Sequence, residues 1–261
     1  MIKKKIVDFL SRNGFYAHFK FYKDKIYKNR IEKELEKKRL EFYSNIVSKG
    51  DFCFDVGANL GNRTDVFLNL GCKVLAVEPQ PQLVKYLKNK FQNKIILIPK
   101  AIGAERGKSK MLVSADSPLS SLSAEWVNEV KKKRFDNVVW DKSIDVELIT
   151  LDDLIEEYGK PDFCKIDVEG FELEVLKGLT QSIRLLSFEF TIPEFTEKAI
   201  ECLNYLSTLG NFTCNYSSGE SLSFNLKDWL VPTKFIPLFR LLPEHGVVDG
   251  DIYVKFIELP R

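Results

Sequence analysis

A glycine-rich turn between a strand and a helix constrains this chain more than any other sequence feature. A short apolar run ends on Asp55, and the turn GANLG follows at residues 57–61. Asn62 and Thr64, residue types common near helix starts, come next. Glycines let a backbone approach a ligand closely, and the free N–H groups of a helix start bind anionic groups. The strand, turn and helix therefore predict a nucleotide-cradling unit.

The type of nucleotide follows from the glycines that are missing. A dinucleotide-binding turn that begins at Gly57 requires glycines at positions 59 and 62, where this chain has Asn59 and Asn62. A pyrophosphate would lose its close backbone contact there. The pattern D-V-G-x-N-x-G suits S-adenosylmethionine, which has a small zwitterionic tail and no phosphate. Three alternatives stay open, namely an NAD-dependent oxidoreductase, a non-catalytic nucleotide-binding module and a turn that serves only tight packing.

The rest of the chain from residue 51 alternates strands and helices with short links, which predicts a parallel sheet with crossover helices. The expected strands are 52–56, 73–78, 95–98, 108–113, 145–150, 163–167, 185–190, 212–216 and 251–257. The expected helices are 62–69, one starting at Pro79, 151–158 with Thr150 as its N-cap, 172–177 and 194–209. The last two strands form a hairpin-like pair. The fold class is α/β, with a doubly wound, mostly parallel sheet and an antiparallel last strand.

Two further segments are predicted to contact the nucleotide. The second strand ends on Glu78, 23 residues after Asp55. Nucleotide-binding folds place an acid at about this distance, where its carboxylate accepts the ribose hydroxyls. The third strand leads into Ala101-Ile102, which we expect beside the adenine.

Acidic residues also end the strands predicted over residues 163–167 and 185–190. In doubly wound sheets the ligand lies outside the carboxyl ends of the strands where their order reverses. Here that place is expected between the strands over residues 52–56 and 163–167. Asp167 and Glu169 would then face the glycine turn across a cleft, and Glu189 would lie on the same side. The alternative for Asp167 and Glu169 is that each only caps the following helix.

Six segments together carry a family resemblance: FDVGANLGNRT, VEP, KAIGAERG, SPLSSLS, ITLDDLIEE and KIDVEGFELEVLKGL. In this order, over about residues 50–190, they resemble the FkbM family of S-adenosylmethionine-dependent methyltransferases. The resemblance implies a class I methyltransferase fold, which is Rossmann-like, and methylation of hydroxyl groups of sugars, glycans or natural products. The predicted cofactor-binding residues are Asp55, Gly57, Ala58, Asn59, Gly61, Thr64, Glu78, Pro79, Ala101, Ile102 and Asp167.

The implied reaction is an in-line displacement that depends on holding oxygen, carbon and sulfur in line. An alcohol needs its proton removed by a base or its oxygen bound by a metal. Asp167 and Glu189 could hold Mg²⁺ or Mn²⁺ through oxygen ligands. A metal-free mechanism would use Asp167 or Glu169 as base. His245 is another candidate, because it precedes the last strand and histidine titrates near neutrality.

Charge is uneven along the 261 residues, whose formal net charge is only +2. Residues 1–50 hold 14 Lys and Arg against 6 Asp and Glu. We predict a basic N-terminal helical extension over residues 1–49 and an S-adenosylmethionine-binding domain over residues 50–261. The extension would pack as a cap on the core, make peripheral contact with anionic lipid, or meet a homo-oligomer partner. It shows no nucleic-acid recognition motif, so no nucleic-acid partner is predicted.

The location of the protein is predicted from two further features. No run reaches the roughly 18 to 20 apolar residues of a transmembrane segment. The five cysteines are dispersed without metal-type spacing, which favours a reducing compartment. We therefore predict a cytoplasmic protein.

Recognition of the small-molecule or glycan acceptor is expected in residues 115–143 and 217–250. The first of these segments begins with a serine-rich stretch and contains Trp126 and Trp140. We predict that it forms a mobile lid in which a tryptophan covers the acceptor ring. The alternative is that the tryptophans anchor a surface loop to the core.

Overall fold

A computed structural model describes residues 33–114, 120–134 and 138–257 of the chain. The chain divides into two compact units, Met1–Glu41 and Phe42–Arg261. In the first unit, residues 33–41 are helical, and the basic helices predicted for residues 1–32 lie outside the described residues. Within the described ranges, no helix has both the length and the apolar character that crossing a bilayer demands.

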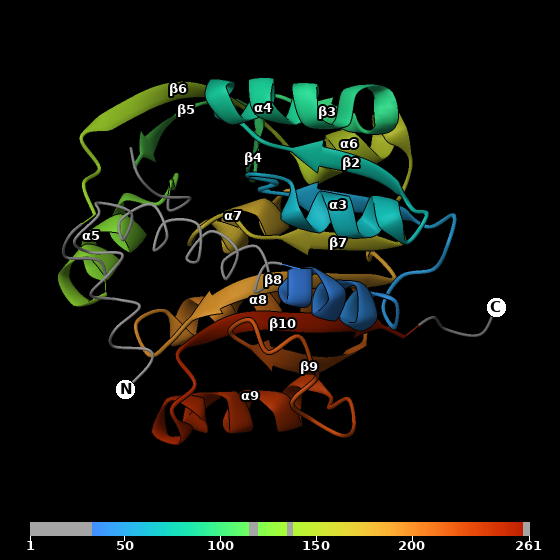
Figure 1. Cartoon of the computed structure of the whole chain (residues 1–261). Coiled ribbons are helices and arrows are strands. Elements are labelled where there is room, and N and C mark those ends of the chain that lie inside the picture. The colour runs from blue at the N-terminus through green and yellow to red at the C-terminus, as the bar shows by residue number, and fades with distance from the viewer. Residues whose placement is uncertain (1–32, 115–119, 135–137, 258–261) are drawn as a thin grey trace, which may run out of the picture. The chain divides into compact units, whose positions relative to one another are not determined.

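The second unit is built on a seven-stranded sheet in the order β3-β2-β1-β7-β8-β10-β9 (Figure 1). Its strands are β1 (Phe52–Val56), β2 (Lys73–Val77), β3 (Ile96–Ile98), β7 (Phe163–Ile166), β8 (Leu185–Thr191), β9 (Phe212–Ser218) and β10 (Asp249–Phe256). The first five strands in spatial order are parallel, whereas β10 runs antiparallel between β8 and β9. The predicted α/β class, the antiparallel last strand and the reversal of strand order between β1 and β7 are confirmed.

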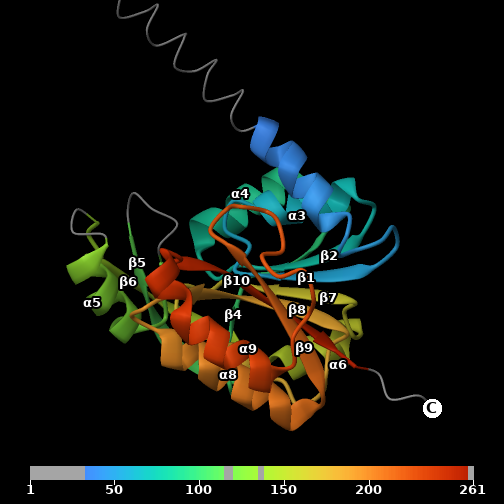
Figure 2. The ribbon, with the colours of Figure 1, turned by 90° about the horizontal axis from the view of Figure 1, so that it is seen from below.

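Helices cover both faces of this sheet. They are α3 (Asn62–Asn69), α4 (Pro81–Phe91), α6 (Leu151–Tyr158), α7 (Glu172–Lys177), α8 (Thr196–Leu209) and α9 (Pro232–Leu241), with short 3₁₀ turns at Gln92–Lys94 and Leu242–His245. Figure 2 shows α3 and α4 on one face and α6, α8 and α9 on the other. The predicted start at Pro79 is wrong, because Gln80 is still extended and Pro81 takes the first helical turn.

The main hydrophobic core lies on the face that α6, α7, α8 and α9 cover. Alternate residues of the central strands point into it, among them Phe54, Ile166 and Phe188, all fully buried. On the opposite face, Tyr43 packs edge-on against Phe67 of α3. Residues 42–47, which the sequence interpretation assigned to the N-terminal extension, thus contribute to the core of the second unit.

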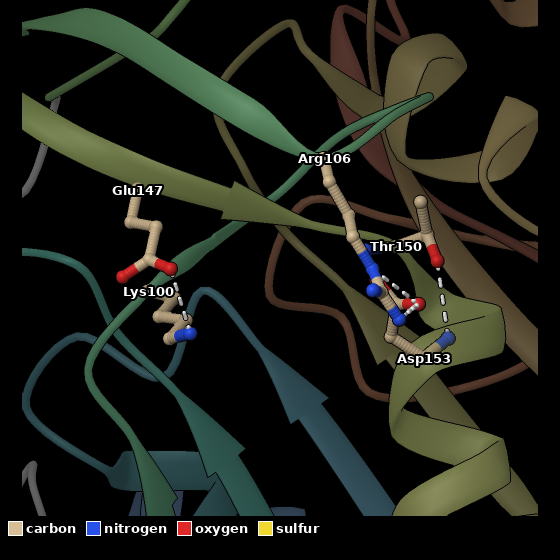
Figure 3. Close-up of polar contacts among 5 residues, drawn as sticks. All are labelled: Lys100, Arg106, Glu147, Thr150 and Asp153. Atoms are coloured by element: carbon tan, nitrogen blue, oxygen red, sulfur yellow. Dashed lines mark hydrogen bonds and ion pairs between the residues drawn. The ribbon is translucent and has the colours of Figure 1, made fainter.

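A second, three-stranded sheet has the order β4-β6-β5, formed by Ala101–Ile102, Lys142–Ile149 and Gly107–Val113. Arg106 binds Asp153 of α6 through both its Nε and Nη2 groups (Figure 3). Asp153 also completes the predicted cap of α6, in which Thr150 and Asp153 bond each other's backbone N–H groups. Helix α5 (Ala124–Lys133) follows β5. Neither this helix nor the separate sheet was predicted from the sequence.

Candidate functional site

The glycine turn packs directly against the ends of two neighbouring strands. The N–H groups of Gly57 and Ala58 donate to the carbonyl of Val77, at 3.0 and 2.9 Å. Gly57 has a φ of +84°, and a Cβ added to it would lie 1.8 Å from the carbonyl oxygen of Asp167. Any side chain at this position would clash with the Asp167 carbonyl, so only glycine fits. The turn and the end of β7 therefore lie next to each other, as the sequence predicted.

The acid predicted to bind ribose lies beside this turn. Glu78 is 3% exposed and accepts backbone N–H groups from Asn59 at 3.0 Å and from Gln80 at 2.9 Å. Asn59 adopts a left-handed φ of +51° at the point where its N–H meets the carboxylate. Burial raises the pKa of Glu78 to about 6, even though both hydrogen bonds favour the ionised form.

Three other predicted cofactor residues have partners within the protein. The hydroxyl of Thr64 donates to the Asp55 carboxylate at 2.5 Å, and both side chains are buried. Gly61 has a φ of +73°, and a Cβ there would lie 2.5 Å from the ring of Phe91. These contacts fix α3 and α4 against the sheet and so hold the turn in place.

The predicted adenine contacts lie in the small sheet. Ala101 and Ile102 form β4, which pairs with β6, and their side chains are buried. Pro79 is half-buried in the extended segment directly after Glu78. Contact of these three residues with a cofactor stays a prediction.

Three carboxylates meet where β7 and β8 end. Asp167, Glu169 and Glu189 each offer a carboxylate oxygen, and these oxygens lie within 4.8 Å of one another. We call them the carboxylate cluster. The sequence predicted all three residues, and the structure brings them together at the strand end against which Gly57 packs.

Lys165 supplies a positive charge to this cluster. Its side chain is 2% exposed, and its Nζ lies 2.5 Å from Oδ2 of Asp167. Burial opposes the charge on Lys165, yet Asp167 and Asp251 raise its pKa above the ordinary value. For Asp167, burial acts to raise the pKa, but the Lys165 ammonium outweighs it and the pKa falls below its usual range. Asp167 and Lys165 therefore form an ion pair in which the Lys165 side chain is buried and the Asp167 side chain is 36% exposed.

The other two acids of the cluster resist ionisation. Burial, followed by repulsion from Asp167, raises the pKa of Glu169 well above its ordinary value. For Glu189 the causes are burial and then repulsion from Glu169 and Asp167. Both groups hold a proton more firmly than a free carboxyl does, until a nearby cation stabilises their ionised form.

A row of polar residues crosses the sheet beneath this site. The register aligns one residue from each of five adjacent strands, all at most 2% exposed: Asp55, Lys165, Ser187, Tyr253 and Asn215. Sequence reasoning missed the last four. The sequence signal that could have found them is a polar residue inside a short apolar strand, such as Lys165 between Cys164 and Ile166.

Two predicted residues have different surroundings from those expected. His245 is exposed at the end of the turn after α9 and lies outside the carboxylate cluster. Trp126 is only 2% exposed, and it packs so closely on Gly170 that a Cβ there would lie 2.4 Å from its ring. This burial favours the predicted alternative, in which the indole anchors its segment to the core. The covering role of Trp126 and the mobile lid stay predictions, and residues 115–119 and 135–137 of that lid lie outside the described residues.

Comparison with known proteins places the sequence among methyltransferases. It matches the family model described as "Methyltransferase FkbM domain" over residues 55–216. It is 29% identical to the hexuronic acid methyltransferase AglP of Haloferax volcanii over 145 residues, which are 54% of this chain and 55% of that protein. A chloroplastic ribosomal RNA small subunit methyltransferase of Arabidopsis thaliana is 40% identical over 45 residues, 17% of this chain and 13% of that protein. The chain thus spans about half the length of the first relative.

Solved structures were compared as well. A TehB-like SAM-dependent methyltransferase from Corynebacterium glutamicum aligns with a TM-score of 0.46 and 10% identity, covering 89% of this chain and 97% of that one. Precorrin-6y C5,15-methyltransferase from Geobacter metallireducens aligns with a TM-score of 0.42 and 12% identity, covering 86% and 87%.

Proposed function

Because the chain belongs to the FkbM methyltransferase family, we propose that it transfers a methyl group from S-adenosylmethionine to a hydroxyl group of a sugar or glycan. The main support is the contact between Gly57 and the Asp167 carbonyl. This contact joins a turn suited to the cofactor with a cluster of acids suited to deprotonating an acceptor.

The residues around the turn fit the cofactor. Glu78 offers a carboxylate to the ribose hydroxyls, and each of its oxygens keeps a lone pair beyond the N–H group that it already accepts. At Gly57 the Asp167 carbonyl oxygen takes the place of a Cβ, so the turn lies directly against the end of β7. When bound, S-adenosylmethionine supplies an electrophilic methyl group on a positively charged sulfur.

Within the carboxylate cluster, we assign proton removal to Glu169 or Glu189. Asp167 is held ionised by its pairing with Lys165, and its negative charge raises the pKa values of its two acidic neighbours. The raised pKa values of Glu169 and Glu189 make them stronger bases once ionised. A positively charged sulfur close by favours that ionised form, so that the base is ready when the cofactor is in place.

The same three carboxylates also fit a divalent cation, because hard ions such as Mg²⁺ or Mn²⁺ prefer oxygen ligands. Asp167, Glu169 and Glu189 would hold it, and it would supply a Lewis acid for the acceptor oxygen. Lys165 already occupies one Asp167 oxygen and would compete with the ion.

The acceptor class is proposed from the relative in Haloferax volcanii, whose name describes a hexuronic acid methyltransferase. A sugar acceptor suits a site that is rich in carboxylates, because sugar hydroxyls donate hydrogen bonds to carboxylate oxygens. A hexuronic acid would add a carboxylate, for which Lys165 and Arg63 are the nearby cations.

The proposal is tested by binding and by product analysis. Isothermal titration should show binding of S-adenosylmethionine and S-adenosylhomocysteine and no binding of NAD. Mass spectrometry should then find a product heavier by one methylene after incubation with methyl glucuronide or methyl glucoside. Tight NAD binding without any response to S-adenosylmethionine would overturn the assignment. Cofactor binding without either product would reject the sugar class alone.

A further inference from the structure

Glu169 adopts a backbone conformation that its residue type disfavours. Its φ is +54°, in the left-handed region that glycine and asparagine occupy more readily. Such strain persists only where the surrounding structure imposes it, and it concentrates at functional sites. In this conformation the Glu169 carboxylate reaches Asp167 and Glu189.

Glu172 holds the backbone on both sides of this residue. Its Oε1 accepts the N–H of Val168 at 3.3 Å and the N–H of Gly170 at 3.1 Å. Glu172 is 8% exposed and begins helix α7, so its own position is fixed. Both bonds end on one oxygen, and together they span the strained residue.

Ser121 holds Glu169 from the opposite side. Its hydroxyl donates to the Glu169 carbonyl at 2.5 Å. Ser121 is fully buried, and its backbone exchanges two hydrogen bonds with Leu112 of β5, at 2.9 and 3.0 Å. Trp126 then closes over Gly170. The small sheet and α5 thereby form a rigid support for the loop that carries Glu169.

We propose that Glu172 and Ser121 are positioning residues, which hold Glu169 in its left-handed conformation so that its carboxylate joins Asp167 and Glu189. This inference rests on the proposed function for its effect on turnover. Neither residue needs to touch the cofactor or the acceptor, because each acts through the backbone around Glu169. Placing a reacting group from a rigid support is a general requirement of catalysis.

The test compares Glu172→Ala with Glu172→Gln. Glutamine keeps Oε1, so it should retain both hydrogen bonds, whereas alanine removes them. Glu174→Ala is the matched control, because this acid lies on the same helix but pairs only with Lys177 in the described contacts. Crystals of each variant with S-adenosylhomocysteine should show the Glu169 carboxylate displaced in Glu172→Ala alone. Amide hydrogen exchange at Gly170 should accelerate in the same variant.

Turnover of methyl glucuronide supplies the second measurement. We expect Glu172→Ala to lower kcat on the order of 100-fold, with the KM for S-adenosylmethionine within about twofold of wild type. Glu172→Gln should restore most of the rate, and Ser121→Ala should give a smaller loss.

An undisplaced Glu169 carboxylate in Glu172→Ala would overturn the proposal, as would a displaced carboxylate with an unchanged kcat. Equal losses of kcat in the alanine and glutamine variants would overturn it as well. If the wild-type protein binds S-adenosylhomocysteine but methylates no sugar, the proposed acceptor class fails. The position of the Glu169 carboxylate in the crystals would still show whether Glu172 holds it beside Asp167 and Glu189.

Discussion

The buried carboxylate of Glu78 accepts hydrogen bonds from two backbone N–H groups. Oε2 accepts from Asn59 and Oε1 from Gln80, so the carboxylate orients the turn before any ligand arrives. Its pKa of about 6 lies above that of a free glutamate, because burial disfavours the ion. As the pH rises from 4.5, the ordinary pKa of glutamate, to about 6, this group ionises in the unfolded chain before it does in the folded protein, so the stability of the cofactor-free fold falls.

We expect this titration to govern cofactor affinity. Since an ionised carboxylate is the stronger acceptor for ribose hydroxyls, affinity for S-adenosylmethionine should rise between about pH 5 and pH 7. Glu78→Ala should weaken binding by about 1.5–3 kcal/mol. Isothermal titration across this range measures both effects, and Glu78→Gln should bind weakly without the pH-dependent step. The prediction fails if wild-type affinity is flat with pH.

Gly57 offers a test of the turn itself. Gly57→Ala should destabilise the protein by about 2–4 kcal/mol, because it combines a positive φ with a steric clash against the Asp167 carbonyl. Gly107→Ala is the matched control, since a Cβ at Gly107 would meet nothing within 4 Å. Urea unfolding of both variants gives the comparison. Equal stability of the two variants would show that the turn tolerates a side chain.

A chelation experiment separates the two ways of activating the acceptor. We expect turnover to survive EDTA, because Lys165 already neutralises Asp167 and the cofactor's own positive charge can ionise Glu169 or Glu189. The measurement is the methylation rate before and after dialysis against EDTA. Loss of activity that Mg²⁺ or Mn²⁺ restores would instead assign the carboxylate cluster to a metal.

Residues in local motifs were predictable from the sequence, and residues that act through strand pairing were not. Gly57, Glu78 and Asp167 each stand at the end of an apolar strand, so their position follows from a few neighbouring residues. Lys165 becomes significant only when β7 lies between β1 and β8, and Asp251 only when β10 aligns it with Glu189. Glu172 could be placed on a helix, but the two N–H groups that it accepts depend on the loop before it.

At the scale of elements, α5 packs into the core, although the composition of its segment suggested a loop. The polar segment before Trp126 suggested a loop, yet Ser123 caps α5 by accepting the N–H of Trp126 at 3.1 Å. Helix α5 then buries Trp126, Val127 and Val130. A serine-rich stretch thus ends in a helix start, for which serine is well suited.

The burial of Trp126 predicts a stability effect. Trp126→Ala should destabilise the protein by about 3–5 kcal/mol, because it leaves a cavity beside Gly170. Trp126→Phe should cost less than about 2 kcal/mol, since the buried indole N–H has no hydrogen-bond partner among the described residues. Thermal unfolding of both variants checks the order. If Trp126→Ala changed only the KM for the acceptor and left the stability unchanged, the result would support the prediction that Trp126 covers the acceptor.

At the scale of the whole second unit, the two faces of the central sheet differ in polarity. One face is apolar and packs on α6, α7, α8 and α9, while the other carries the polar row of Asp55, Lys165, Ser187, Tyr253 and Asn215. Buried polar groups stabilise less than apolar ones of similar volume. The polar row therefore contributes less to the free energy of unfolding than apolar side chains of the same volume would contribute. It lies on the face of the sheet that also carries the carboxylate cluster.

The place of β10 between β8 and β9 sets the order in which a growing chain can assemble. Strands β8 and β9 leave the ribosome well before β10, so each lacks β10 as a neighbour until Asp249–Phe256 has been made, although β8 can already pair with β7. Until then both strands present unpaired edges, which are sites of aggregation. Glu189 gains its cross-strand partner Asp251 in the same late step. Synthesis of β10 thus completes the sheet and brings Asp251 beside Glu189 in one late step, so a chain interrupted before Asp249 would be a target for chaperones.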